Sequence, residues 1–166
     1  MRVFKKILLV LAIALVAIQF VRPAKNLATG PQPDDALVRY PASAEVKQLL
    51  TAACYDCHSN TTRYPWYSQI QPVGWWLAQH VRDGKHDLNL SELAAYRPKT
   101  AMERLDACID QVNDRVMPLR SYRITHADAR LTEAQVKLLA DWFEETRDLI
   151  EQQIPAKSAA GAATTK

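Results

Sequence analysis

The stretch CYDCHSN, residues 54–60, brings two cysteines and a histidine into one short cluster. Cysteines separated by two residues and followed directly by histidine are typical of three kinds of site: covalent haem attachment, part of a zinc site, and a redox-active dithiol. The secondary structure around the cluster, and the other ligands that the chain can supply, decide among these three interpretations.

The sequence on both sides of the cluster has the apolar period of helices. Ser43 can cap a helix that leads directly into Cys54, with apolar residues at i, i+3, i+4 and i+7. Pro72 suits the first turn of a second helix, and Gly84 is expected just past its end. The apolar positions are Val46, Leu49, Leu50 and Ala53 in the first helix, and Val73, Trp76, Leu77, His80 and Val81 in the second.

Two capping-box patterns predict further helices downstream. Thr100 with Glu103, and Thr132 with Gln135, each precede a run of apolar residues at helical spacing. A short helix is expected from Ser91 to Tyr96. Because no segment alternates apolar and polar residues as a strand would, the sequence predicts an all-α fold.

This all-α pattern favours haem among the three interpretations of the cluster. A thioredoxin-like dithiol expects a βαβ setting, and a structural zinc site usually needs four cysteine or histidine ligands. Cys108, the only other cysteine, lies on an apolar helical stripe and is interpreted as a buried small hydrophobe, with a reactive thiol or an intermolecular disulfide as alternatives. We therefore predict one covalent haem c, with Cys54 and Cys57 forming thioethers and His58 as proximal iron ligand.

The N-terminus predicts export. Basic residues precede an apolar run from Ile7 to Ile18, and no A-x-A-like cleavage site follows, which favours an uncleaved anchor over a signal peptide. The charge bias places the domain outside the cytoplasm, in the periplasm. We expect an export signal or inner-membrane anchor over residues 1–22, a tether over 23–41, a haem-binding domain over 42–154 and a disordered tail over 155–166.

The charge of the chain argues against a nucleic-acid partner. The 21 lysines and arginines nearly balance the 18 acidic residues, and Arg2, Lys5 and Lys6 lie before the apolar run. A nucleic-acid surface needs clustered basic residues, which the neutral body of this chain does not offer.

The sequence resembles the class I c-type cytochromes, in which a helix leads into C-x-x-C-H and a later loop supplies a methionine. Over residues 21–150 it is similar to the small bacterial haem-binding domain family with an N-terminal hydrophobic segment. The similar strings are CYDCHSN (54–60), YPWYSQIQPVGWWLAQHV (64–81), LNLSEL (88–93) and MPLRSY (117–122). This resemblance implies a membrane-tethered haem protein, but it supplies no substrate.

The sixth iron ligand has two candidates. Met117 precedes Pro118 between two predicted helices, and Pro118 favours an extended loop that can hold a thioether at the iron. His80 is the alternative, although its position on an apolar helix face also suits a core residue. Met102 is expected in the core, His86 in solvent and His126 in a loop.

Several other residues near these segments are expected to pack on the haem or to contact its propionates. The tryptophans at 66, 75 and 76 and Tyr67 are interpreted as core or haem-packing groups. The arginines at 63, 120 and 123 could pair with propionates or remain exposed. Together these features predict a monohaem c-type cytochrome, an electron carrier that passes single electrons between redox protein partners at the periplasmic face of the membrane. The alternatives are a peroxidase-like enzyme or gas sensor with a displaceable sixth ligand, and a passive haem-binding module.

Overall fold

The computed structural model describes residues 2–154, and the expected disordered tail lies outside this range. These residues form helices, with no strand beyond one isolated bridge between Leu27 and Thr61, which confirms the predicted all-α class. The helices are α1 (Arg2–Ile18), α2 (Ala36–Arg39), α3 (Ala44–Ala53), α4 (Tyr55–His58), α5 (Val73–Asp87), α6 (Pro98–Asn113), α7 (Arg120–Thr125) and α8 (Glu133–Gln152), with three 3₁₀ turns η1 (Trp66–Gln69), η2 (Leu90–Ala95) and η3 (Ala127–Ala129).

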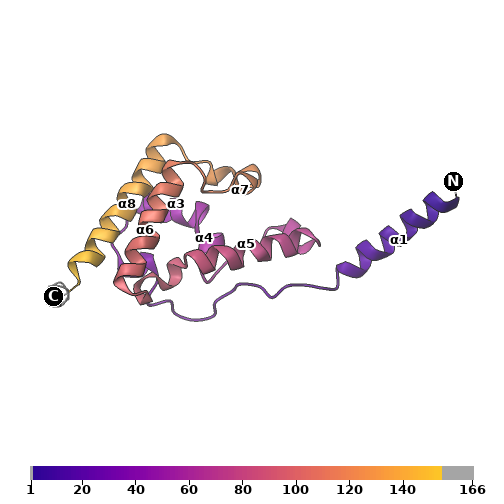
Figure 1. Cartoon of the computed structure of the whole chain (residues 1–166), viewed down its shortest axis with the longest axis horizontal. Helices are drawn as coiled ribbons and strands as arrows, with labels where there is room; N and C mark the ends of the chain where they lie inside the picture. Colours follow the sequence, from indigo (N-terminus) through magenta and orange to yellow (C-terminus); the bar gives the residue numbers. More distant parts are fainter. Residues whose placement is uncertain (1, 155–166) are drawn as a thin grey trace, which may run out of the picture.

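Helices α6 and α8 lie side by side and antiparallel, and α3 packs against α8 (Figure 1). Leu50 of α3, Leu105 of α6, and Leu139 and Phe143 of α8 are almost completely buried where these three helices meet. Each such side chain contributes about 1.5–3 kcal/mol when it leaves water. The core therefore fixes the end of α3, where Cys54 lies.

Most predicted helix starts are correct. Ser43 Oγ accepts a hydrogen bond from the Val46 amide, and the Thr132–Gln135 capping box is complete at the start of α8. The expected start at Thr100 is wrong, because α6 already begins at Pro98. Proline suits the first helical position, since its fixed φ matches the helix and no intrahelical partner is missing there.

The segment expected to be a tether is largely folded onto the domain. Asp35 caps α2 through the Leu37 amide, and Ala36 is fully buried in the core. Asn26 donates a side-chain hydrogen bond to the Ser59 carbonyl at 2.9 Å. Polar contacts hold this segment, which has no apolar period, so the domain begins near Asn26 rather than at residue 42.

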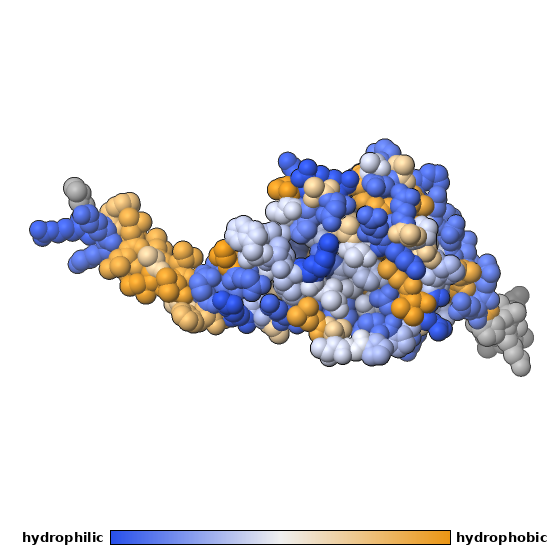
Figure 2. Space-filling view, turned by 180° about the vertical axis from the view of Figure 1, so that it is seen from behind, coloured by the Kyte–Doolittle hydropathy of each residue, from blue (hydrophilic) through white to orange (hydrophobic). Residues whose placement is uncertain are grey.

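Helix α1 projects away from the domain and carries the N-terminal apolar run (Figure 1). In the space-filling view it is an orange, hydrophobic cylinder with blue residues at its outer end (Figure 2). Within residues 2–154, no helix combines the length and the apolar content needed to cross a membrane.

Candidate haem site

Cys54 stands at the break between α3 and α4, and Cys57 and His58 lie on the single turn of α4 that follows it. The Cys54 amide closes α3 on the Leu50 carbonyl, and the Cys54 carbonyl then accepts hydrogen bonds from the Cys57 amide at 3.2 Å and the His58 amide at 3.0 Å. All three side chains are half-buried. The break between the two helices thus holds both thiols and the imidazole in a fixed relation.

The environment of the two cysteines favours neutral thiols. Burial, with a smaller contribution from Cys57, raises the pKa of Cys54 to about 12. Burial also raises the pKa of Cys57 to about 11. A reactive dithiol works through a thiolate, which a lowered pKa favours, so these two thiols do not suit that chemistry.

His58 is oriented by two backbone carbonyls of the α5 end. Its Nδ1 lies 2.9 Å from the Gly84 oxygen and 3.1 Å from the Leu88 oxygen, so Nδ1 carries the proton and donates. Burial lowers the pKa of His58, which keeps the ring neutral. A neutral imidazole whose Nδ1–H is bonded to a carbonyl presents Nε2 as a metal ligand in a fixed orientation.

Gly84 makes this orientation possible. The prediction that α5 ends before Gly84 is wrong, because the helix continues to Asp87. A Cβ at Gly84 would lie 2.8 Å from the carbonyl oxygen of Cys57 and 3.2 Å from its Cβ. Glycine therefore allows α5 to pass directly against the cysteine turn, where its carbonyl reaches His58.

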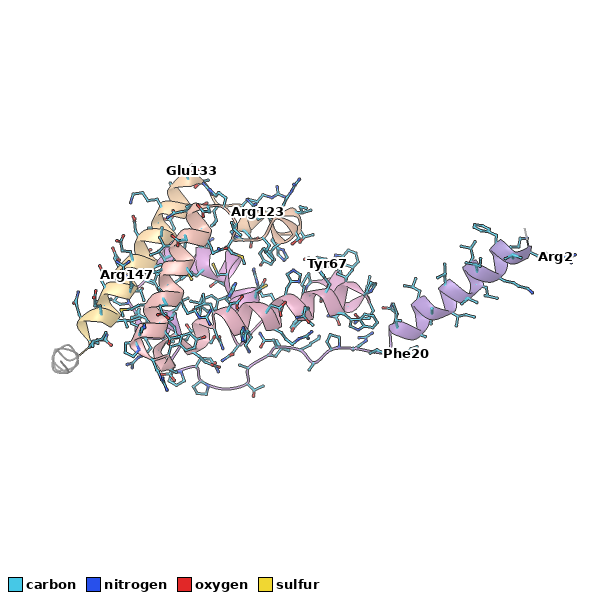
Figure 3. All side chains as sticks on the ribbon, viewed as in Figure 1. Arg2, Phe20, Tyr67, Arg123, Glu133 and Arg147 are labelled. Carbon is cyan, nitrogen blue, oxygen red and sulfur yellow. The ribbon has the colours of Figure 1, made fainter. Side chains whose placement is uncertain are left out.

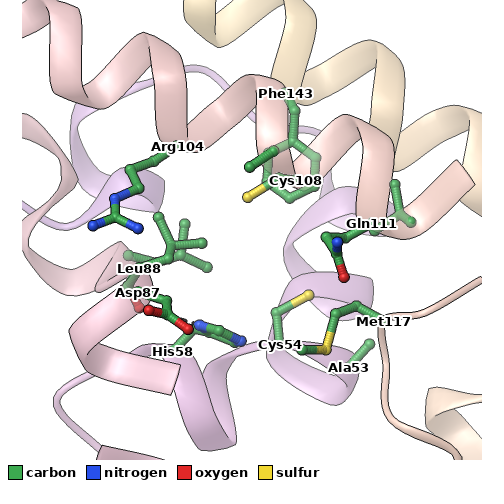
Figure 4. A pocket seen from close by; sticks show the side chains of 13 residues that line it. Ala53, Cys54, His58, Asp87, Leu88, Arg104, Cys108, Gln111, Met117 and Phe143 are labelled. Atoms are coloured by element: carbon green, nitrogen blue, oxygen red, sulfur yellow. Dashed lines mark hydrogen bonds between the residues drawn. The ribbon is translucent and has the colours of Figure 1, made fainter. Parts of the chain in front are cut away.

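A cavity of about 340 Å³ opens beside this turn (Figure 4). Its lining includes Cys54 and His58 on one side, Met117 from the loop after α6, and Cys108 and Arg104 of α6. A smaller cavity of about 130 Å³ continues past His58 and Met117 to Cys57 and Tyr122. The volume and the predominantly apolar lining of the larger cavity are typical of a cofactor site.

Met117, the predicted distal ligand, borders the same two cavities as His58. It follows α6 in the loop, its amide donates to the Gln111 carbonyl at 3.0 Å, and its side chain lines both cavities that His58 lines. His80 lines the smaller cavity as well, with its Nδ1 2.9 Å from the Trp76 carbonyl and its ring 4.2 Å from the Trp76 ring. Both candidates border the hollow, so the choice of Met117 stays a prediction.

Tyr55 and Asp56, the middle residues of the C-x-x-C motif, bond to segments that precede and follow the motif in the sequence. Tyr55 donates to Asp35 at 2.8 Å, and Asp35 is held in turn by Ser91. The buried carboxylate of Asp56 accepts hydrogen bonds from the Arg63 guanidinium at 3.1 Å and from the Tyr122 hydroxyl at 2.7 Å.

Tyr122 is fixed as a hydrogen-bond donor. Burial, and to a smaller extent the Asp56 carboxylate, raise the pKa of the Tyr122 hydroxyl, so it keeps its proton. Since Tyr122 belongs to α7, directly after the Met117 loop, this hydrogen bond fixes that loop over the cavities.

The three arginines near the predicted haem segments differ in their surroundings. The Arg63 guanidinium is bonded to Asp56, Arg120 is exposed, and the buried Nε of Arg123 has no hydrogen-bond partner among the described residues. Sequence reasoning missed Arg104, which lies at the rim of the cavity and lines it (Figure 4). Its spacing of four from Cys108 on α6 was the signal that could have found it.

The expectations for Met102 and His86 agree with the structure. Met102 is partly buried against the core, and His86 is exposed. Cys108 also packs against the core, where burial and the neighbouring Cys54 raise its pKa to about 12. Cys108, the third cysteine of the chain, therefore lines this cavity together with Cys54 although it is not part of the C-x-x-C motif.

These residues fit a haem. Two neutral thiols, an imidazole with a free Nε2, a thioether, an arginine and an apolar hollow form a donor set that suits attachment, axial ligation and propionate pairing. In the described residues, no group of three or more histidine, cysteine, aspartate or glutamate side chains could hold a bare metal ion.

Comparison with known proteins agrees with this geometry. The sequence model of the family described as haem-binding domain matches residues 13–145, which include every residue of the site. No curated protein and no solved structure matches the chain. Because the family match covers most of the chain and the site has the required ligands, the chain belongs to the haem-binding domain family.

Proposed function

We propose that the protein is a monohaem c-type cytochrome that transfers single electrons between redox protein partners at the periplasmic face of the inner membrane. The observation that carries this proposal is the position of His58, with Nδ1 bonded to carbonyls of Gly84 and Leu88, and with Met117 lining the same cavities. Two fixed protein ligands favour electron transfer over ligand exchange.

The roles of the protein groups follow from the site. Cys54 and Cys57 would form the thioethers, His58 Nε2 and Met117 Sδ would be the axial ligands, and Arg104 would pair with a propionate. The bound haem would supply the iron centre that gains and loses one electron. The Tyr122–Asp56 bond would hold Met117 in place, and the apolar lining would limit access of water.

Membrane attachment through α1 is part of the same proposal. The helix projects from the domain with its apolar side chains exposed, and its basic residues lie at the far end. Basic residues tend to stay in the cytoplasm, so the domain would lie on the opposite side of the membrane. A cleaved, soluble periplasmic form is the alternative.

A haem enzyme or gas sensor is a second candidate because of one further cavity. A space of about 380 Å³ lies beside Cys57 and is lined by Trp76, His80 and His126. Such a space could admit a small ligand if Met117 left the iron.

Optical spectra of the purified full-length protein, oxidised and reduced, with and without carbon monoxide, distinguish the two functions. Six-coordinate spectra that carbon monoxide leaves unchanged support the electron carrier. Rapid formation of a carbon monoxide adduct by the reduced protein would contradict it and favour the enzyme or sensor.

A further inference from the structure

One end of the domain exposes large aromatic and apolar side chains. Trp66 is 77% exposed, Trp76 is 51% exposed, and Ile70 and Val73 between them are exposed as well. We call these four residues the aromatic end. The tryptophans are expected from sequence to be core or haem-packing groups, but Trp66 is largely exposed, and its ring lies edge-to-face with the Tyr67 ring, with centroids 5.9 Å apart.

Two residues that lie among those of the aromatic end, Gln71 and Trp75, bond directly to the chain at the end of α1. Gln19 Nε2 donates to the Gln71 carbonyl at 3.1 Å, and the Gln71 amide donates to Gln19 Oε1 at 2.9 Å. The Trp75 indole donates to the Val21 carbonyl at 2.7 Å. In Figure 3, Phe20 and Tyr67 mark the two ends that face each other. Little free chain therefore separates α1 from the domain.

The length of α1 limits where a bilayer surface can lie. Its 17 residues extend about 26 Å at 1.5 Å per residue, less than the ~30 Å hydrocarbon core. If α1 spans the bilayer, the residues that follow it therefore have to enter the hydrocarbon core as well. One of them, Phe20, is 84% exposed. Because Gln19 and Val21 are bonded to the domain, drawing in Phe20 brings the aromatic end to the lipid headgroups.

We infer that the aromatic end rests on the outer surface of the same phospholipid bilayer that holds α1, with the indole rings of Trp66 and Trp76 at headgroup level. This inference rests on the proposed membrane attachment of α1. Tryptophan prefers the membrane interface because its ring is apolar while its N–H finds polar partners. The exposed Arg22 and Lys25 beside this end suit anionic lipid phosphates.

The test uses the full-length protein in vesicles of phosphatidylethanolamine and phosphatidylglycerol. The lipids carry a photoactivatable diazirine close to the headgroup, and mass spectrometry locates the cross-linked peptides. We expect cross-links on α1 and also on residues 66–76. Cross-links confined to α1 would overturn the inference while the anchor stands, and a protein that does not sediment with the vesicles would overturn both.

Matched variants test the role of the indoles. W66S combined with W76S should lower the cross-link yield on residues 66–76 several-fold, whereas V38S should leave it unchanged. Val38 is also exposed, at 68%, but it lies in α2. Helix α2 packs on η2, which follows the C-terminal end of α5, whereas the aromatic end lies at the N-terminal end of α5. If the tryptophan variant instead keeps its lipid cross-links, or changes only self-association in detergent, the aromatic end contacts something other than the bilayer and the inference is wrong.

Discussion

The Tyr122 hydroxyl donates a 2.7 Å hydrogen bond to the Asp56 carboxylate and so joins the loop that carries Met117 to the C-x-x-C turn. The two residues are far apart in sequence, and Asp56 is 6% exposed. The same hydroxyl lies 3.0 Å from the Ala52 carbonyl. This contact therefore helps to fix the loop that carries Met117 relative to the turn that carries His58.

Tyr122→Phe should loosen the Met117 loop. A hydrogen bond to a charged group contributes about 1.5–3 kcal/mol, and its loss leaves Asp56 with Arg63 as its main partner. We expect a lower urea midpoint and a weaker sulfur-to-iron charge-transfer band in the ferric protein. Tyr67→Phe is the control, because Tyr67 bonds only to the exposed Thr125 and to His126. Equal effects of both variants would contradict the special role of Tyr122.

Cys54→Ala combined with Cys57→Ala should abolish covalent haem. After expression with the cytochrome c maturation machinery, the wild type should keep its haem stain in a denaturing gel, since thioethers survive unfolding and axial bonds do not. Cys108→Ala should keep the stain, although Cys108 lines the same cavity as Cys54. A stain that persists without Cys54 and Cys57 would show that the attachment hypothesis is wrong.

Met117→Ala should remove the sulfur-to-iron charge-transfer band, lower the reduction potential and open the iron to added ligands. Thioether ligation raises the potential, so its loss has this sign. His80→Ala should keep the band, because the contacts of His80 with Trp76 explain its position without ligation. The opposite result for the two variants would establish His80 as the distal ligand.

Gly84→Ala should destabilise the protein despite the higher helix propensity of alanine. Alanine gains about 1 kcal/mol over glycine inside a helix, but its Cβ would lie 2.8 Å from the Cys57 carbonyl oxygen. Overpacking typically costs about 1–3 kcal/mol, and backbone cannot rotate out of the way as a side chain can. Urea unfolding should show a lower midpoint.

The control for this substitution is Gly30→Ala, because a Cβ at Gly30 would meet no atom within 4 Å. That variant should unfold at the wild-type midpoint. A Gly84→Ala protein as stable as Gly30→Ala would show that α5 can move away from the cysteine turn.

Local patterns predicted much of the fold. Ser43 and the Thr132–Gln135 pair mark helix starts through contacts between residues three apart, and such contacts are visible in a sequence. The fold of residues 26–40 was not predictable in this way. Asp35 is held by Tyr55 and Ser91, which are distant in sequence and have no periodic pattern.

The candidate site also has one part that the sequence predicted and another part that it did not. Cys54, Cys57 and His58 form one local motif, and the structure places them on one turn beside a cavity. The hydrogen bond between Asp56 and Tyr122 depends on tertiary packing, so sequence reasoning missed it. Gly84 was misread because glycine commonly ends helices, whereas here it permits close packing inside one.

If Cys54 and Cys57 carry haem as proposed, the contacts of Tyr55 and Asp56 bear on the order of haem attachment and folding. In the folded chain Tyr55 is bonded to a segment that precedes the motif and Asp56 to one that follows it, so the motif is tied to the fold on both sides. An enzyme that ligates haem to Cys54 and Cys57 needs the motif as an accessible peptide. Ligation would therefore have to come before these two segments dock, and a chain that folded first would have closed off its own substrate sequence.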